Sequence, residues 1–361
     1  MTADDLAEAL RAAVLAQRFE ATADSLQQGA PLGWHPSIDL AVAVFPPGAA
    51  PVAANVLFSR EHPGGLVARF DEVTGAVGNI AFHADVRDAA GDSHAWLPGA
   101  DWSRIAFPAW FGSGPRVVSP YPASLLKMMV AVGAARLVDQ GRSDWALPLA
   151  HAGKTRPLAD WLHDMIIVSS NEATSALVAH LHARGAIRRE RGREVHNELH
   201  ELFAAHGLRG LMIANTQPDG GWGNAAGAGV GQIQMTAWDA LRLMWRLDAD
   251  APAMPELVSP ASRAVLRRAL DEQQFNVILS SGSHRALPGW VAGIPARFAH
   301  KTGNTQNYAS DAGIVHDGDL HYLIAVTTSL GSRYAPHADA ATTWQLPALG
   351  AAVHAWLKLR A

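Results

Sequence analysis

Residues 120–132 read PYPASLLKMMVAV and place one lysine in an otherwise apolar run. This lysine, Lys127, follows Ser124 by three residues and lies between leucine and methionine. A charged amine in an apolar interior costs several kcal/mol unless it is paired or neutralised. The segment therefore predicts a buried helix in which the lysine charge is compensated or its environment serves a chemical purpose.

Ser124 and Lys127 would share one face of that helix, because residues three apart are neighbours on a helix surface. A serine hydroxyl is a weak nucleophile unless a nearby base removes its proton. Burial lowers the pKa of a lysine, so a buried amine can serve as that base. Alone, the pair has a structural alternative, since serine often caps a helix and lysine often extends to the surface.

The composition indicates a globular protein of one large domain or two subdomains. Of its 361 residues, 49% are hydrophobic and 17% are charged, which predicts a large interior. The formal net charge of −4 gives no electrostatic reason to expect binding to nucleic acid. The chain has no cysteine, which excludes disulfides, thiolate nucleophiles and cysteine-ligated metals.

The sequence carries no recognisable targeting or membrane segment. Residues 1–26 form an amphipathic pattern without the basic and apolar regions of a secretory signal. No run of about 18 apolar residues occurs, so no transmembrane helix is expected. Either the protein is cytoplasmic, or a leader is missing from this chain.

Strand patterns lie near both ends of the chain, and helical patterns fill the middle. After a first helix, strands are expected at 38–45, 55–58 and 76–82. Helices are expected at 124–138, 157–168, 172–184, 188–205, 236–247 and 260–272. The remaining elements are strands at 296–302, 309–315 and 320–328 and a helix at 345–359. This order predicts an antiparallel sheet built from both chain ends, with an inserted helical subdomain.

We divide the chain into three segments on this basis. Residues 1–119 would hold the N-terminal helix, the first strands and an extended loop region that joins the sheet. Residues 120–295 would form the helical subdomain, and residues 296–361 the last strands and final helix. Sites commonly lie in clefts between such parts.

Two further polar segments interrupt the apolar pattern. Residues 168–174, VSSNEAT, lie between two expected helices, where a turn with a helix cap is the structural alternative. Residues 298–305, FAHKTGNT, end an expected strand with a cation, a hydroxyl and a glycine. Gly303 would let another backbone or a ligand approach closely, although a simple glycine turn is the alternative.

Together the three segments resemble the motif set of the penicillin-recognising serine hydrolases, the serine β-lactamases and D-alanyl-D-alanine peptidases. That set has S-x-x-K at a helix start, S-x-N between helices and K-T-G on a late strand. The resemblance covers about residues 120–330. It implies an α/β (α+β) protein with the β-lactamase/transpeptidase-like fold, an antiparallel sheet flanked by helices plus an all-helical subdomain.

The resemblance also implies a role for each motif residue. Ser124 would be the acylated nucleophile, and Lys127 its base or proton relay. Ser169 would deliver a proton to the leaving nitrogen, and Asn171 would hydrogen-bond the amide side chain of the substrate. Lys301 would maintain the electrostatics of the site.

The substrate-binding strand completes the implied site. Thr302 would bind a substrate carboxylate beside Gly303, and the backbone N–H groups of Ser124 and Asn304 would form the oxyanion hole. The substrate would be a small molecule or peptide, such as a β-lactam or a peptidoglycan-like peptide. No cofactor and no metal are expected, a monomer is expected, and a periplasmic or secreted location is implied if a leader was removed.

The loop between the second and third motifs leaves the branch of this family open. Class A β-lactamases carry a water-activating glutamate there, within an E-x-x-L-N pattern. This loop has no glutamate, and its only carboxylate is Asp219, which precedes glycines as turn residues often do. Asp219 is the candidate to orient water, and Trp222 in the same loop is expected to contact substrate.

Three functions remain in order of preference. PASLLKMM and KTGNT resemble carboxypeptidase motifs, and Asp311 stands where class A enzymes often have an arginine. The helices around Ser169 and the expected helix at 236–247 resemble class A. We expect first a class A β-lactamase-related serine hydrolase that forms an acyl-enzyme. A D-Ala-D-Ala-type carboxypeptidase or esterase is the alternative, followed by a penicillin-binding sensor without turnover.

One histidine pair resembles a metal motif. His196 and His200 would lie four residues apart on one helix, as in zinc peptidases, but those peptidases need glutamate where Asn197 stands. The dense mixed charge around the pair predicts a solvated helix face. A second polar group has no recognisable ligand spacing: His83, Asp85 and His94.

Overall fold

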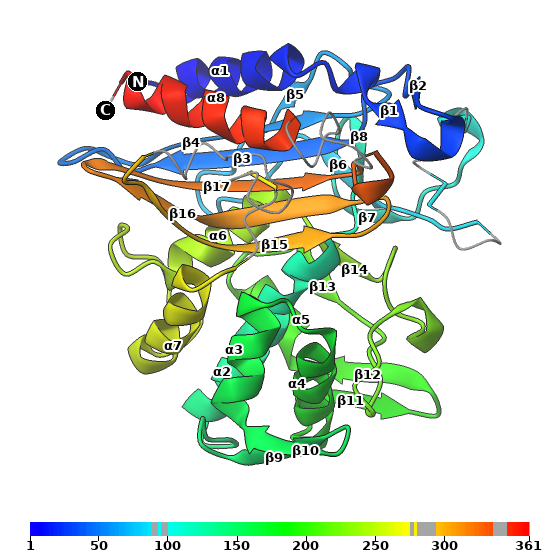
Figure 1. The fold of residues 1–361 in the computed structure, drawn as a ribbon, viewed down its shortest axis with the longest axis vertical. Helices are drawn as coiled ribbons and strands as arrows, with labels where there is room; N and C mark the ends of the chain where they lie inside the picture. The colour runs from blue at the N-terminus through cyan, green and yellow to red at the C-terminus, as the bar shows by residue number, and fades with distance from the viewer. Residues whose placement is uncertain (89–92, 95–99, 275–277, 280–293, 335–344, 361) are drawn as a thin grey trace.

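The computed structural model describes residues 1–88, 93–94, 100–274, 278–279, 294–334 and 345–360. Its largest sheet is antiparallel, with the strand order β15–β16–β17–β3–β4–β5 (Figure 1). The strands are β3 (Ile38–Val44), β4 (Val52–Phe58), β5 (Leu66–Val67), β15 (Arg297–Asn304), β16 (Ala309–Asp317) and β17 (Leu320–Thr328). The predicted sheet built from both chain ends is thus confirmed.

Strand β3 lies in the middle of this sheet, and all seven of its residues are buried. Ile38 pairs with Phe58 on one side and with Thr328 on the other. A strand covered on both faces reads as a continuous apolar run, which explains the sequence IDLAVAV. The two faces of the sheet contribute to separate hydrophobic clusters.

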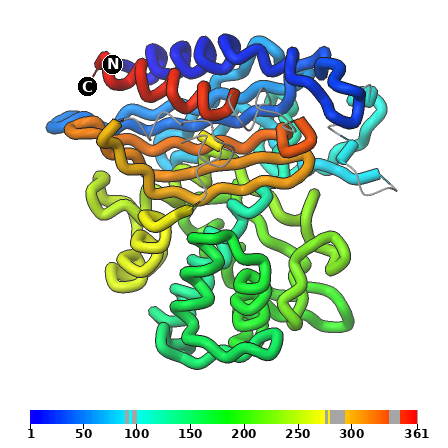
Figure 2. The backbone as a smooth tube through the Cα atoms, viewed as in Figure 1, coloured from blue at the N-terminus to red at the C-terminus, as the bar shows by residue number. Residues whose placement is uncertain are grey.

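The first and last helices, α1 (Ala3–Ala16) and α8 (Leu346–Lys358), pack together and cover one face of the sheet (Figure 2). The buried side chains of α1 include Leu6, Leu10 and Val14, which recur every four residues and form one apolar stripe. A capping box between Thr2 and Asp5 fixes the start of this helix.

The other face of the sheet meets the helical half of the molecule (Figure 1). Its helices are α2 (Lys127–Asp139), α3 (Leu158–Ile167), α4 (Asn171–Ala183), α5 (Glu198–Ala205), α6 (Ala237–Leu247) and α7 (Pro260–Asp271). Helix α2 contacts α3, α4 and α7 and is buried on nearly every side, as an apolar sequence all around a helix requires. Of the helices in the described part of the chain, none is long and apolar enough to cross a membrane. Residues 280–293 of the expected middle segment lie outside the described residues.

Short strands form smaller sheets around these layers. One of them has three strands, with β6 (Ala81–Ala84) between β7 (Ala109–Gly112) and β8 (Arg116–Ser119). Two-stranded pairs include β1 (Ala23–Asp24) with β2 (Ala30–Pro31), β9 (Pro148–His151) with β10 (Lys154–Pro157), and β13 (Leu211–Ile213) with β14 (Ile233–Met235).

The predicted helix at 188–205 is wrong over its first half. A hairpin of β11 (Ile187–Glu190) and β12 (Arg193–Asn197) stands there, and helix α5 begins only at Glu198. Arg191 and Gly192 both adopt positive φ, 49° and 78°, as in the two-residue turns that match strand twist. His196 therefore lies on a strand and His200 on a helix, so they do not form the expected pair on one helix face.

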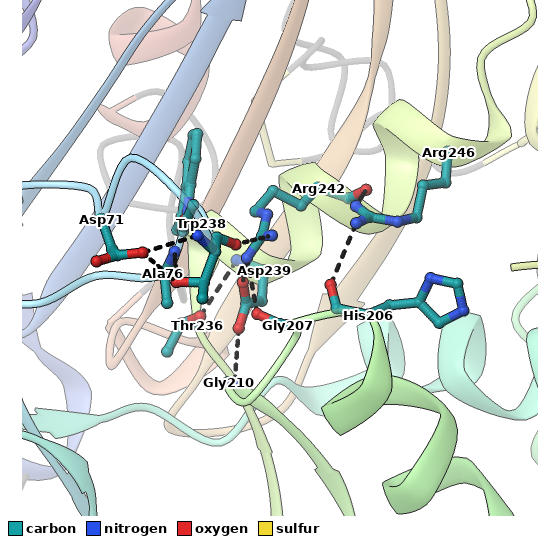
Figure 3. Close-up of polar contacts among 12 residues, drawn as sticks. Asp71, Ala76, His206, Gly207, Gly210, Thr236, Trp238, Asp239, Arg242 and Arg246 are labelled. Atoms are coloured by element: carbon teal, nitrogen blue, oxygen red, sulfur yellow. Dashed lines mark hydrogen bonds and ion pairs between the residues drawn. The ribbon is translucent and has the colours of Figure 1, made fainter. Parts of the chain in front are cut away.

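Helix α6 is held between the two halves by buried polar contacts (Figure 3). Asp239 accepts a hydrogen bond from Gly210 N at 2.6 Å and another from Arg242 at 3.1 Å. Arg242 also donates to the carbonyls of Gly207 and Thr74, both at 2.8 Å. These contacts join α6 to the loop before β6 and to the turn after α5.

Candidate active site

Ser124 lies in a 3-10 turn, η4 (Ala123–Leu126), that leads directly into α2. Lys127 is the first residue of α2, and its Nζ lies 3.0 Å from Ser124 Oγ. Ala123 adopts a positive φ of 49°, so the backbone turns sharply just before the serine. The lysine side chain is fully buried, whereas Ser124 is partly exposed. A partly exposed hydroxyl thus has a buried amine beside it.

Ser169 lies in the turn between α3 and α4, and two lysine amines approach it. Lys127 Nζ lies 2.9 Å from Ser169 Oγ and 2.6 Å from its carbonyl oxygen. Lys301 Nζ lies 3.1 Å from the same hydroxyl. Ser169 adopts a φ of 53°, a strained conformation for a residue with a side chain. The hydroxyl therefore bridges the amines of two distant motifs.

Asn171 is the first residue of α4 and is exposed at the same turn. Its Oδ1 accepts a hydrogen bond from Lys127 Nζ at 2.9 Å. Asn171 thus helps to hold the lysine amine, a contact that the sequence analysis did not include. Its predicted contact with the substrate stays a prediction.

Both lysine amines have lowered pKa values. Burial lowers the pKa of Lys127 from 10.5 to about 7. Burial also lowers the pKa of Lys301 well below its usual value, and the nearby charge of Lys127 lowers it further. Near neutral pH a substantial fraction of Lys127 is therefore a neutral amine, which can accept the proton of Ser124.

Strand β15 brings the third motif against the serine turn. Lys301 is fully buried, and its Nζ also donates to the carbonyl of Thr302 at 2.6 Å. A Cβ atom added to Gly303 would lie 2.6 Å from both Ser124 N and Pro122 O. No residue with a side chain fits between this strand and the turn, so Gly303 permits the close approach.

Ser310 is a supporting residue that the sequence analysis missed. It pairs with Gly303 across β15 and β16, and its hydroxyl donates to the carbonyl of Pro122. Ser310 therefore fixes the turn that carries Ser124. Ser310 is 186 positions from Ser124 in the chain, so no local sequence pattern indicates that the two are close. Only the strand register places Ser310 beside the serine turn.

The remaining residues of the third motif lie at the end of β15. Thr302 is buried, and Asn304 is exposed. Asp311 pairs with Thr302 in register and accepts from His300 Nδ1 at 2.8 Å. His300 and Lys301 are adjacent on a strand and point to opposite faces, so Asp311 lies on the face away from Lys301. Asp311 and Thr302 thus share the face of His300, opposite Lys301.

The loop between β13 and β14 brings Trp222 to the site and keeps Asp219 in a turn. The ring centroid of Trp222 lies 5.9 Å from Lys127 Nζ. Asp219 is exposed, and its Oδ1 accepts from Gly221 N at 2.9 Å. This contact is typical of an aspartate that closes a turn. A water-orienting role for Asp219 stays a prediction.

The chain is similar to a known protein family and to several solved structures. The model of the Beta-lactamase enzyme family matches residues 118–348. PBP-A has a similar structure, with a TM-score of 0.52 and 17% identity over 90% of this chain and 92% of that one. A β-lactamase from Sphaerobacter thermophilus DSM 20745 is also similar, with a TM-score of 0.51 and 15% sequence identity. The match covers 96% of this chain and 97% of that one. The TLA-1 extended-spectrum β-lactamase has a TM-score of 0.51 and 12% sequence identity, over 98% of each chain. No curated protein matches the sequence.

Proposed function

Because this chain belongs to the beta-lactamase enzyme family, we propose that it is a serine hydrolase that acts through an acyl-enzyme on an amide or β-lactam carbonyl. The observation that carries this proposal is the 3.0 Å contact between Lys127 Nζ and Ser124 Oγ. The lowered pKa of Lys127 supports it, because a neutral amine can act as the base.

In the acylation step, Lys127 removes the proton of Ser124 while Oγ attacks the carbonyl carbon. The tetrahedral intermediate carries its negative charge on the former carbonyl oxygen, where the N–H groups of Ser124 and Asn304 stabilise it. The carbon–nitrogen bond then breaks, and the proton passes from Lys127 through Ser169 Oγ to the leaving nitrogen. The contacts of Ser169 with Lys127 and Lys301, at 2.9 and 3.1 Å, support this route.

The second step is hydrolysis of the ester on Ser124 by water. We place a class A β-lactamase-related activity first and a D-Ala-D-Ala-type carboxypeptidase or esterase second. The turn contact of Asp219 and the absence of glutamate from its loop favour slow hydrolysis of the ester. That observation supports a third candidate, a penicillin-binding sensor that is acylated but does not turn over.

A chromogenic cephalosporin distinguishes these functions when absorbance and intact protein mass are followed together. Continuous colour development indicates a β-lactamase. A stable mass increase without turnover indicates a peptidase or a sensor, and hydrolysis of a D-Ala-D-Ala peptide separates those two. The absence of both signals, with cleavage of a simple ester substrate, indicates an esterase.

Two serine variants test the choice of nucleophile. Ser124→Ala should give no adduct and no turnover, whereas the exposed Ser113→Ala should behave like the unmodified chain. Circular dichroism should show that both variants are folded. An adduct that persists in Ser124→Ala would overturn the assignment of the nucleophile.

A further inference from the structure

A pair of histidines lies at the end of the sheet away from Ser124. His316 and His321 are directly opposite each other on β16 and β17, so both side chains point to the same face. Their rings are stacked, with centroids 4.1 Å apart and an interplanar angle of 16°. A tight turn through Gly318, with a φ of 61°, joins the two strands and fixes this register.

Asp248 brings a carboxylate to this pair from the C-terminal end of α6. Its side chain is fully buried, and Oδ2 lies 2.6 Å from His321 Nε2. One ligand atom from each of Asp248, His316 and His321 lies within 4.8 Å of the other two. Asp250, two residues later, places a carboxylate oxygen 3.8 Å from His316 Nε2. Two imidazoles and two carboxylates thus converge.

Two independent observations indicate that this cluster suits a cation. His316 Nε2 is buried, and no residue in the described part of the chain hydrogen-bonds to it. Asp248 is already oriented, because its Oδ1 accepts from Arg267 at 3.1 Å and from Asp250 N at 3.2 Å. Oδ2 therefore remains directed at the histidines, and such supporting hydrogen bonds are typical of carboxylate ligands. The negative end of the α6 dipole also favours positive charge here.

We propose that His316, His321 and Asp248 bind one divalent transition metal, Zn²⁺, with Asp250 as a fourth ligand. The two imidazole nitrogens favour Zn²⁺ over the harder Mg²⁺ and Ca²⁺, which prefer oxygen ligands, and Zn²⁺ also accepts the carboxylates. Tetrahedral Zn²⁺ with bonds of about 2.0–2.1 Å holds its ligand atoms about 3.3 Å apart. The two stacked rings would turn on binding to bring their nitrogens to that spacing. The two carboxylates balance the metal charge beside Arg267.

The proposed metal would be structural and would not take part in the reaction at Ser124. Ser310 lies beside the serine turn, and His316 is six positions further along β16, about 20 Å away in an extended strand. The metal would join the β16–β17 hairpin to the end of α6. No metal was expected from the sequence, and these three residues were not singled out there. Asp248 is distant from the histidines in the chain, and their spacing matches no zinc motif.

The test is a calorimetric titration of the untagged full-length protein with ZnCl₂ after treatment with a chelator. We expect one Zn²⁺ per chain and a dissociation constant in the micromolar range or below. Co²⁺ in place of Zn²⁺ should give the visible absorption of a tetrahedral site. The thermal midpoint should rise with Zn²⁺, because a ligand that binds only the folded state stabilises it.

Single-ligand variants and a matched histidine control decide the outcome. His316→Gln and His321→Gln should each weaken binding by about a hundredfold or more, and Asp250→Asn by less. His62→Gln, which removes a histidine outside the cluster, should bind Zn²⁺ like the unmodified chain. Circular dichroism without metal should show that all variants are folded. Absence of saturable binding, or equal binding by the two cluster variants and the unmodified chain, would overturn the proposal.

Discussion

At the scale of single residues, Ser169 combines backbone strain with two lysine contacts. Its hydroxyl lies 2.9 Å from Lys127 Nζ and 3.1 Å from Lys301 Nζ, and its φ is positive at 53°. Such a conformation costs about 1–3 kcal/mol and persists only where the surroundings enforce it. A strained residue held by two buried amines supports the proposed passage of the proton from Lys127 through Ser169 to the leaving nitrogen.

Adjacent serine variants separate this role from a structural one. Ser169→Ala removes the bridging hydroxyl and should slow acylation about 100-fold to 10,000-fold, the usual contribution of a proton-transfer group. Ser170→Ala removes the N-cap of α4, which accepts from Ala173 N at 3.1 Å. It should cost about 1 kcal/mol of stability with little effect on acylation. The rate of adduct formation measures acylation, and urea unfolding measures stability. Equal acylation rates in Ser169→Ala and Ser170→Ala would contradict the proton-transfer role.

The pKa of Lys127 sets the pH dependence of acylation. Burial lowers this pKa from 10.5 to about 7, and only the neutral amine accepts the serine proton. The rate of adduct formation should therefore rise with pH, with a midpoint near pH 7 and a plateau about one pH unit above it. Lys127→Arg, which stays protonated throughout, should show no such rise. A midpoint near 10, typical of an exposed lysine, would contradict the lowered pKa of Lys127.

Sequence spacing alone predicts part of this site. Helix geometry places Lys127 beside Ser124, because the two residues are three apart. The approach of Ser169 and Lys301 followed only from the resemblance to a known family. Ser310 could not be found, because its contact with the serine turn depends on strand register and the path of a long chain.

At the scale of secondary structure, Gly303 makes the contact between β15 and the serine turn possible. In Gly303→Ala the added Cβ would lie 2.6 Å from two backbone atoms, so the strand must move away. Acylation should fall about a hundredfold or more, because displacing reacting groups by about 1 Å has that effect. Gly64→Ala, where nothing lies within 4 Å, is the matched control. Similar acylation by both variants would contradict the required close approach.

Elements with strong apolar periodicity were predictable, whereas short hairpins were not. All seven residues of β3 are buried, and all but Asp39 are apolar. This apolar run predicted the strand. Hairpins β9–β10 and β11–β12 turn at Ala152-Gly153 and Arg191-Gly192, all with positive φ. The usual hairpin signals are Asn-Gly and Asp-Gly, which are absent from both turns. Their strands are also half exposed, so burial left little pattern to detect.

At the scale of the whole molecule, Asp39 connects the sheet to the helical half. This buried residue of β3 accepts from Ala237 N, at the start of α6, at 2.8 Å and from Asn55 at 2.6 Å. Burial raises the pKa of Asp39 from 3.8 to about 6. Ionisation of this carboxylate therefore weakens the fold at the junction of its two halves.

Asp39→Asn should show this effect in the pH dependence of stability. Between pH values of about 4 and 6 the folded chain binds more protons than the unfolded chain at this residue, so its contribution to stability falls as pH rises. The variant lacks that fall. Its free energy of unfolding relative to the unmodified chain should increase by up to about 3 kcal/mol from pH 4 to pH 7. Urea unfolding at both pH values measures this, and a constant difference would contradict the raised pKa.

The pairing of Ile38 with Thr328 also has a consequence during protein synthesis. A nascent chain that has emerged through residue 171 contains Ser124, Lys127 and Ser169, but one edge of β3 still has no partner. Lys301 and β17, which pairs with that edge of β3, are made only later. Folding of the sheet must therefore wait until Thr328 has emerged, and until then an apolar edge of β3 is open to association with other chains.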